Sequence, residues 1–277
     1  MSPGFFTRIA LRLWLSLPTY VRLFTYKTLV NAGIRLYGRT ISPRTYRLPF
    51  NLYAKFGNYV VDSEANAIRY VCENTTVPVP RIIDCISVPT GVLIVMTRLP
   101  GEPLGRHFIH MTTKERAQFQ RDLGSALKQL HRTSAPDPLI SAIDGKPFAD
   151  WRISEGGLHG PFDSEKELYE YLYKRIPSEH HQRLRDLARS VHDVPHRLCL
   201  THNDISPNSI LVDNNRFSGL VGWEGAAWLP EWWEYTRSIY MRDRWREWVD
   251  LMNEAHPELY PKELEVETKF WDVNFPW

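Results

Sequence analysis

The sequence contains few cysteines, and their arrangement excludes two common protein classes. Of the 277 residues only three are cysteine, Cys72, Cys85 and Cys199. Their scattered spacing matches neither a metal site nor a paired disulfide framework. An odd number of unpaired cysteines fits a reducing compartment better than a secreted disulfide-rich scaffold. We therefore expect a cytoplasmic protein.

A long uncharged apolar run is also missing. Within residues 5–37 the longest uncharged stretch, Leu13–Val21, is far too short to span a bilayer and contains Pro18. Basic residues interrupt the apolar positions, which makes a poor signal peptide. The apolar positions recur at helical spacing instead, which favours two helices packed on the body of the protein. A helix lying on a membrane surface is the less favoured alternative.

Neither strong charge nor repetition marks the chain. The formal net charge of +2 gives no reason to expect a nucleic-acid partner. There is no internal repeat and no low-complexity segment. Hydrophobic residues make up 43% and charged residues 24%, an ordinary globular balance. The length suits two modest domains or one bilobal domain with a substantial core.

The order of predicted elements indicates an α+β chain. Strands are expected at Leu52–Phe56 and Gly91–Met96, with a helix at Asp62–Glu73 between them. The segment Leu99–Pro103 holds two prolines and a glycine, which is typical of a linker. Beyond it, apolar periodicity predicts mainly helices: Thr113–His131, 163–175, 180–191, and a tail from Glu231 onward.

This order predicts a small sheet lobe followed by a larger helical lobe. We expect an N-terminal helical extension (1–40), an N-lobe (41–98) and a C-lobe (99–277). A cleft between two such lobes is a natural ligand site.

The stretch Leu198–Trp228 presents polar residues before a predicted hairpin. A short apolar run leads into the loop that holds His202 and Asp204, and two short strands with a turn between them follow. An Asp in this position suits a general base or a cation ligand. A loop whose Asp only stabilises a turn fits the stretch equally well.

Four polar residues in a fixed order favour a functional Asp over one that only stabilises a turn. Lys55 lies on a predicted strand, Glu64 on the next helix, and His202 and Asp204 on the loop before the hairpin. Kinases use a strand Lys paired with a helix Glu to hold nucleotide phosphates, and a loop Asp to orient the attacking hydroxyl. Each residue alone is a weak signal, but the ordered set with a linker inside it favours a kinase-like site.

From about Tyr46 to Tyr240 the sequence resembles the aminoglycoside phosphotransferase and choline kinase-like family, in particular its fungal members. The N-terminal region is similar to the leader of those fungal proteins. The resemblance implies a bilobal protein-kinase-like fold, with a small antiparallel-sheet N-lobe and a larger, mainly helical C-lobe. It also implies ATP in the cleft and phosphorylation of a small-molecule hydroxyl. The matching segments are AKFG (54–57), DSEANAIRYVCENTTVPVPRIID (62–84), VMTRLPGEPL (95–104), LKQLH (127–131), GPFDSEKELYEYL (160–172), THNDISPNSILVD (201–213) and WEGAAWLPEWWEY (223–235).

The resemblance assigns roles to matching positions. Lys55 would contact the α- and β-phosphates, and Glu64 would hold Lys55. The segment Met96–Leu99, which includes Arg98, would be the hinge that offers backbone groups to adenine. Asp204 would be the catalytic base, and His202 would order its loop.

Three positions depart from the family pattern. The Asn that binds magnesium is Ser209 here, and the metal-chelating Asp is Gly222. The glycine-bearing loop before AKFG is replaced by Tyr46–Asn51, which contains no glycine, so a close approach of backbone to phosphate is not expected. Asn208 and Glu224 are the candidate substitute ligands. Magnesium prefers hard oxygen ligands in octahedral geometry, so we expect no intact metal site.

These departures favour a degenerate, pseudokinase-like member with weak or absent catalysis, which retains ligand binding or acts through a protein partner. One alternative is an active ATP-dependent phosphotransferase that acts on a small-molecule acceptor with rearranged metal ligands. Another is a membrane-associated scaffold that uses the N-terminal helices.

In the C-terminal tail, Glu231 and Glu234 are expected to be solvated helix charges rather than contacts to a cationic acceptor. Most of the tryptophans between Trp228 and Trp248 are expected to be core.

Overall fold

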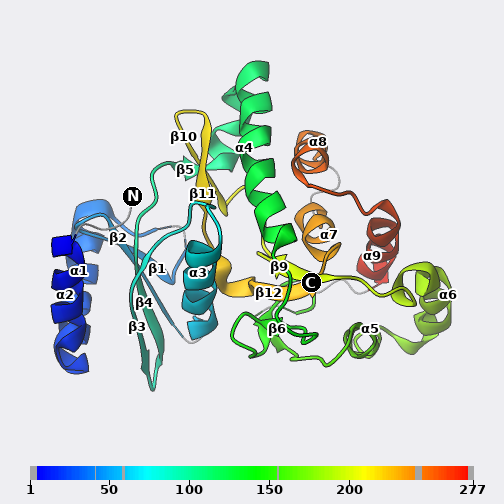
Figure 1. Cartoon of the computed structure of the whole chain (residues 1–277), viewed down its shortest axis with the longest axis horizontal. Helices are drawn as coiled ribbons and strands as arrows, with labels where there is room; N and C mark the ends of the chain where they lie inside the picture. The colour runs from blue at the N-terminus through cyan, green and yellow to red at the C-terminus, as the bar shows by residue number, and fades with distance from the viewer. Residues whose placement is uncertain (1–4, 41, 58–59, 155, 241–244, 274–277) are drawn as a thin grey trace.

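The computed structural model describes residues 5–40, 42–57, 60–154, 156–240 and 245–273. The chain forms two lobes (Figure 1). The N-lobe contains α1 (Phe5–Ser16), α2 (Thr19–Tyr37), β1 (Thr45–Leu48), β2 (Leu52–Gly57), α3 (Asp62–Asn74), β3 (Ile82–Val88) and β4 (Gly91–Thr97). The C-lobe contains β5 (Glu102–Pro103), α4 (Thr113–Arg132), β6 (Ser141–Ala142), β7 (Phe148–Ala149), β8 (Leu158–His159), α5 (Glu165–Tyr173), α6 (His181–His192), β9 (Leu198–Thr201), β10 (Ile210–Asp213), β11 (Arg216–Leu220), β12 (Ala227–Pro230), α7 (Trp233–Ile239), α8 (Arg246–Ala255) and α9 (Pro261–Val273).

The N-lobe is built on one antiparallel sheet with strand order β1-β2-β4-β3. Helix α3 lies on the side of the sheet that faces the C-lobe, and α1 and α2 lie on the other side (Figure 1). Because side chains alternate along β2, neighbouring residues face opposite helices. Ala54 packs in the cluster that includes Tyr26 of α2. Lys55 pairs across the sheet with Ile94, which packs with α3, so its side chain faces α3 and the cleft.

Helix α2 lies close against the edge strand β1 because of one glycine. A Cβ on Gly33 would come within 1.9 Å of the backbone oxygen of Arg47, so any larger residue would push the helix away. The two helices predicted for residues 5–37 are confirmed as α1 and α2, which pack on the sheet. No helix in the described part of the chain is long and apolar enough to cross a membrane.

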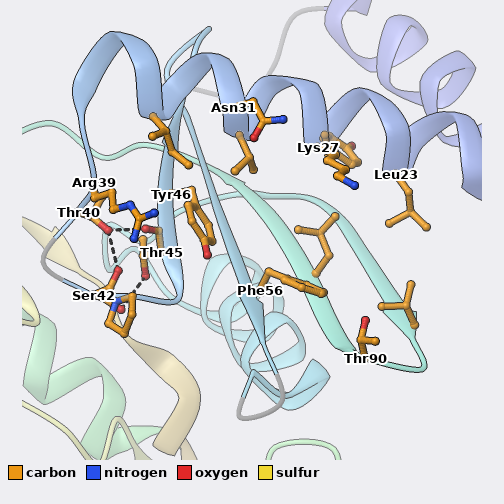
Figure 2. Close-up of a pocket in the computed structure, with 16 residues that line it drawn as sticks. Leu23, Lys27, Asn31, Arg39, Thr40, Ser42, Thr45, Tyr46, Phe56 and Thr90 are labelled. Carbon is orange, nitrogen blue, oxygen red and sulfur yellow. Dashed lines mark hydrogen bonds between the residues drawn. The ribbon is translucent and has the colours of Figure 1, made fainter.

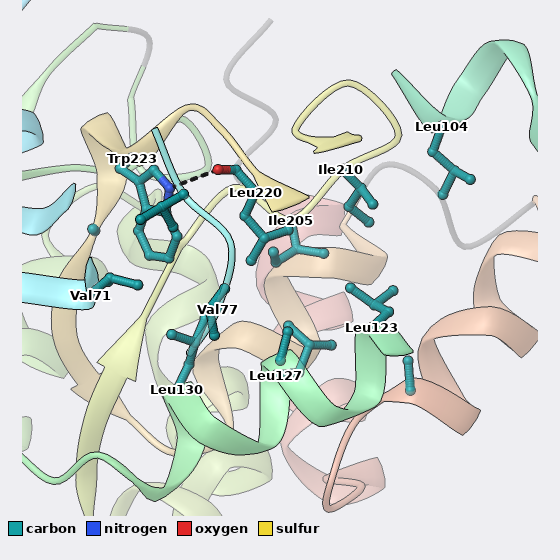
Figure 3. Close-up of a cluster of buried hydrophobic side chains, with 14 of the residues drawn as sticks. Val71, Val77, Leu104, Leu123, Leu127, Leu130, Ile205, Ile210, Leu220 and Trp223 are labelled. Atoms are coloured by element: carbon teal, nitrogen blue, oxygen red, sulfur yellow. Dashed lines mark hydrogen bonds between the residues drawn. The ribbon is translucent and has the colours of Figure 1, made fainter. Parts of the chain in front are cut away.

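The C-lobe core packs the hairpin β10–β11 onto helix α4. Figure 3 shows Ile210 and Leu220 of the hairpin near Leu123, Leu127 and Leu130 on one face of α4. These α4 positions repeat every three to four residues, the apolar stripe that predicts this helix. Thr112 caps the N-terminus of α4 in a capping box with Glu115. The core thereby fixes the strands that follow the polar loop.

The segment predicted as a linker is partly a strand. Glu102 and Pro103 form β5, which pairs with Leu211 and Val212 of β10 and extends the hairpin to three strands. Gly101 makes this possible, because its φ is +96° and a Cβ there would lie 2.3 Å from the oxygen of Val212. The α+β class and the kinase-like arrangement of a small sheet lobe and a larger helical lobe are confirmed. The division at residues 40 and 98 stays a prediction.

Candidate functional site

A lysine and two glutamates meet on the cleft side of the N-lobe sheet. The Nζ of Lys55 lies 2.6 Å from Oε1 of Glu64 on α3 and 2.8 Å from Oε2 of Glu224, which follows β11 in the C-lobe. The structure therefore brings together Lys55 and Glu64, as the sequence predicts. It adds Glu224, a residue 169 positions away from Lys55 in sequence. This contact ties the two lobes together across the cleft.

The three charges share one environment but differ in their pKa. Burial, together with the nearby Glu224 carboxylate, raises the pKa of Glu64 to about 7 despite the adjacent Lys55. Burial alone would raise the pKa of Glu224 too, but the charge of Lys55 outweighs it and holds that pKa at about 2. Burial would lower the pKa of Lys55, but the two carboxylates raise it above its ordinary value. The cluster thus contains one cation and two carboxylates. Of the two carboxylates, Glu64 binds a proton more readily.

Backbone bonds to a buried glutamate hold the loop that carries His202 and Asp204. Glu234 of α7 accepts hydrogen bonds from the backbone N–H groups of His202, at 2.5 Å, and Asn203, at 3.1 Å. Asn203 has a φ of +64°, a left-handed conformation that Asn tolerates better than most residues. Its side chain bonds to the oxygen of Ala149 and to the indole N–H of Trp233. The loop conformation is therefore fixed from both sides.

His202 is a structural part of this loop. Its side chain is fully buried, and burial lowers its pKa to about 4, so the imidazole is neutral at physiological pH. One ring nitrogen contacts the oxygen of Val221 at 3.1 Å, and the other accepts from the backbone N–H of Asp204 at 3.2 Å. These contacts are what a residue that orders the loop would make.

Asp204 lies next to a buried arginine. A guanidinium nitrogen of Arg237 on α7 is 3.3 Å from Oδ1 of Asp204. Arg237 is only 5% exposed and also lies 3.9 Å from buried Asp150. The side chain of Asp204 is 29% exposed, so it keeps an open side. Arg237 can therefore fix the direction of the carboxylate while leaving it accessible.

The two positions where the family pattern has metal ligands differ in surroundings. The hydroxyl of Ser209 is buried, donates to the backbone oxygen of Asp204 at 2.6 Å and accepts from the N–H of Ser206 at 2.8 Å. Gly222 has a φ of +82°, and a Cβ there would lie 3.7 Å from Oε2 of Glu224 and 4.0 Å from Cβ of Ser209. Asn208 is exposed. Gly222 and Ser209 are therefore neighbours, and Glu224 lies beside them.

The hinge and the glycine-free loop occupy the same end of the sheet. Met96 is buried on β4, and the backbone N–H of Arg98 just after it donates to the oxygen of Asn51 at 2.9 Å. Residues 49–51 form the tight turn between β1 and β2, and Phe50 there is 82% exposed. Most of Tyr46–Asn51 is thus strand and turn near the hinge. The residue of β1 that pairs with Lys55 is Thr45, which lies just before this segment.

Two residues that the sequence reasoning did not place in the site belong to its frame. The expectation that Glu234 is a solvated helix charge is wrong, because it is 8% exposed and its pKa rises to about 7 on burial. The same expectation is wrong for Glu231, which precedes α7, is partly buried and pairs with Arg197 at 3.1 Å. The segment WEGAAWLPEWWEY contains Glu234, but nothing in it shows that this carboxylate at the start of α7 turns inwards. Arg237 had no sequence signal at all.

Most of the tryptophans of this region are core, as expected. Trp228, Trp232, Trp233 and Trp248 are each at most 2% exposed.

Among the described residues, one group of side chains has the spacing to hold a metal ion, and it consists of His131, Glu231 and Glu258. Its members already contact Arg197 and Tyr260, and the group does not include Asp204, Ser209 or Glu224.

Comparisons with known proteins place this geometry in context. Residues 59–263 match the family described as "Phosphotransferase enzyme family"; Lys55 lies just before the matched range. No curated protein matches. Similar solved structures include a thermostable mutant of aminoglycoside phosphotransferase APH(4)-Ia in ternary complex with ADP and hygromycin B, at 13% identity and a TM-score of 0.56, covering 89% of this chain and 91% of that one.

Two further structures agree with this likeness. The gentamicin–APH(2")-IIa complex matches at 15% identity and a TM-score of 0.55, covering 92% of this chain and 86% of that one. Macrolide 2'-phosphotransferase MphH from Brachybacterium faecium matches at 17% identity and a TM-score of 0.51, covering 88% of each chain. At these identities the likeness shows the fold.

Proposed function

The chain belongs to the phosphotransferase enzyme family, and we propose that it is a degenerate, pseudokinase-like member, which binds a ligand in the cleft with weak or absent phosphoryl transfer. The observation that carries the proposal is the state of the three side-chain positions around Asp204. Ser209 is bonded into its own loop, Gly222 has no side chain, and Glu224 is paired with Lys55. Phosphoryl transfer depends on charge neutralisation by metal ions held at such positions.

The residues present do not fit a magnesium ion. Mg²⁺ requires hard oxygen ligands and tends to be held by one or two carboxylates. The hydroxyl of Ser209 is neutral, donates to the oxygen of Asp204 and accepts from the N–H of Ser206, so it could offer a metal ion only one remaining lone pair. Glu224 would have to leave Lys55, and Asn208 is exposed whereas the neighbouring Ser209 is buried. No step of the proposed function therefore depends on magnesium.

Nucleotide binding is the part of the family function that the geometry supports best. One similar structure holds ADP and hygromycin B. By analogy, Lys55 held by Glu64 would contact the phosphates, the backbone after Met96 would contact adenine, and a small-molecule hydroxyl would approach Asp204. A phosphate would compete with Glu224 for the Lys55 ammonium. We therefore expect weak ATP binding that does not depend on magnesium.

Titration calorimetry with ATP, with and without magnesium, tests this function in the native protein and in the double variant Ser209→Asn, Gly222→Asp. The variant restores the two family side chains next to each other, and Asp tolerates the left-handed backbone at position 222 better than most residues. We expect magnesium to increase the ATP affinity of this variant by at least about tenfold, which is the scale of one added charge contact.

The matched control is Ser209→Asn with Gly222→Ala, which adds a Cβ at the same left-handed position but no carboxylate. It should gain nothing from magnesium. Turnover of ATP with a hydroxylated acceptor by the native protein at ordinary kinase rates, about 1–100 per second, would contradict the proposal. That result would instead support an active enzyme whose metal ligands have rearranged.

A further inference from the structure

The N-terminal helices carry a concentration of positive charge. Nine of the 34 basic residues of the chain lie in residues 1–61, and none of the 32 acidic residues does. Helix α2 and the segment after it contribute Lys27, Arg35 and Arg39, and α1 contributes Arg12. None of these four forms a salt bridge with another residue in the part of the chain that the structure describes. Arg22 differs, because it is paired with the buried Asp84.

The same helices expose large apolar side chains. Tyr20 and Phe24 are each 74% exposed and Leu13 is 65% exposed. Tyr20 and Phe24 are four positions apart on α2, so they lie on one face of that helix. Both helices form the end of the molecule that is farthest from the C-lobe (Figure 1). An exposed apolar surface of this kind on a folded protein usually marks a contact site.

A groove opens along the same helix, between α2 and the outer face of the sheet. Its volume is about 770 Å³. Figure 2 shows Leu23, Lys27 and Asn31 of α2 along one wall and Phe56 and Thr90 of the sheet along the other. Arg39 lines the groove as well. The groove thus combines apolar walls with two cations, which suits the anionic headgroup and upper acyl chain of a lipid.

We propose that α1 and α2 bind the surface of an anionic lipid bilayer. Tyr20 and Phe24 would enter the interface between headgroups and acyl chains, and the basic side chains around them would contact anionic headgroups. A second copy of the chain fits this face poorly, because a symmetric contact would bring two sets of cations together without acidic partners. The proposal is independent of the cleft, which lies on the opposite side of the sheet.

Co-sedimentation of the full chain with vesicles tests this surface. Vesicles of phosphatidylcholine alone are compared with vesicles that also contain phosphatidylserine. We expect the native protein to bind the anionic vesicles at least about tenfold more tightly, and to lose that preference in high salt. Tyr20→Glu with Phe24→Glu should weaken binding to anionic vesicles by about tenfold or more.

The matched control is Val194→Glu with Leu259→Glu, which adds the same acidic charge at two apolar side chains of the C-lobe that are 50% and 49% exposed. It should bind as the native protein does. If the helix variant does not fold, Lys27→Ala with Arg39→Ala should weaken binding without adding acidic charge. The proposal is overturned if the native protein does not sediment with anionic vesicles, or if the control loses as much binding as the helix variant. A native dimer that the helix variant converts to a monomer, measured by light scattering, would assign the face to a second copy instead.

Discussion

The two faces of the N-lobe sheet each carry one buried charge cluster, and the clusters are built in opposite ways. On the outer face the sheet supplies the acid: Asp84 of β3 lies 2.5 Å from Arg22 of α2 and accepts a hydrogen bond from the hydroxyl of Tyr26 at 3.1 Å. On the inner face the sheet supplies the cation, Lys55, and two carboxylates meet it.

The difference in charge balance separates a structural tie from a site that can exchange partners. The outer cluster has one cation for one carboxylate, and both are largely buried, with 14% and 5% exposure. The inner cluster has an excess carboxylate, and Glu224 is 30% exposed whereas Glu64 is 1% exposed. Glu224 is therefore the member of the inner cluster that an anionic ligand can displace from Lys55 most readily, whereas Glu64 is the carboxylate that takes up a proton first.

The largest expected effect comes from breaking the outer cluster. Asp84→Ala leaves Arg22 and Tyr26 without their acceptor in a buried place, which should lower the free energy of unfolding by about 3 kcal/mol. Urea unfolding measures the loss, and hydrogen exchange should show faster exchange in α1 and α2. The control is Asp62→Ala, which removes a pair with Lys146 whose side chains are 42% and 49% exposed. It should cost under about 1 kcal/mol. An equal loss in both variants would contradict the structural role.

A smaller effect is expected from the pH dependence of the inner cluster. The folded pKa of Glu64, about 7, lies above its unfolded value, so the folded state binds more protons between about pH 4.5 and 7. The contribution of Glu64 to stability is therefore full below this window and is lost as pH rises through it. Glu64→Gln removes this loss, so the variant should gain about 2 kcal/mol relative to the native protein between pH 5 and pH 8.

Unfolding at several pH values measures this relative gain. Glu170→Gln is the matched control, because Arg185 lowers the pKa of Glu170 and keeps it ionised throughout the window. The stability of that variant relative to the native protein should not change with pH. A flat difference for Glu64→Gln as well would show that Glu64 is ionised over the whole range, with Lys55 fully compensating its burial.

Local patterns were enough to predict most of the elements around the site. The apolar stripe of α4 has a clear helical period, the run Gly91–Met96 is short and continuously apolar as in a buried strand, and the hairpin β10–β11 turns at polar turn residues. Strands β5 and β12 were not predicted. Each forms only because a distant strand offers it backbone partners, as β10 does for Glu102 and Pro103. Such pairing depends on tertiary contacts that no local window contains.

The same limit explains which site residues the sequence revealed. Lys55 and Glu64 are nine positions apart on a strand and the helix after it, so the order of elements predicts their meeting. Glu224 reaches Lys55 across 169 positions, and Glu234 bonds to backbone groups 31 and 32 positions before it. Backbone N–H groups carry no residue signature, so an acid that serves them looks like any helix charge in the sequence.

The smallest expected effect comes from removing the exchangeable carboxylate. Glu224→Gln leaves Lys55 paired with the buried Glu64 and frees one side of its ammonium. If the phosphates of a nucleotide compete with Glu224, ADP should bind about tenfold more tightly to this variant, which corresponds to about 1.4 kcal/mol. Calorimetry without magnesium measures the change. Glu64→Gln is the comparison, and it should weaken ADP binding because Lys55 then stays with Glu224. Unchanged or weaker binding in Glu224→Gln would mean that Lys55 does not meet the phosphates, and that the inner cluster is a structural tie like the outer one.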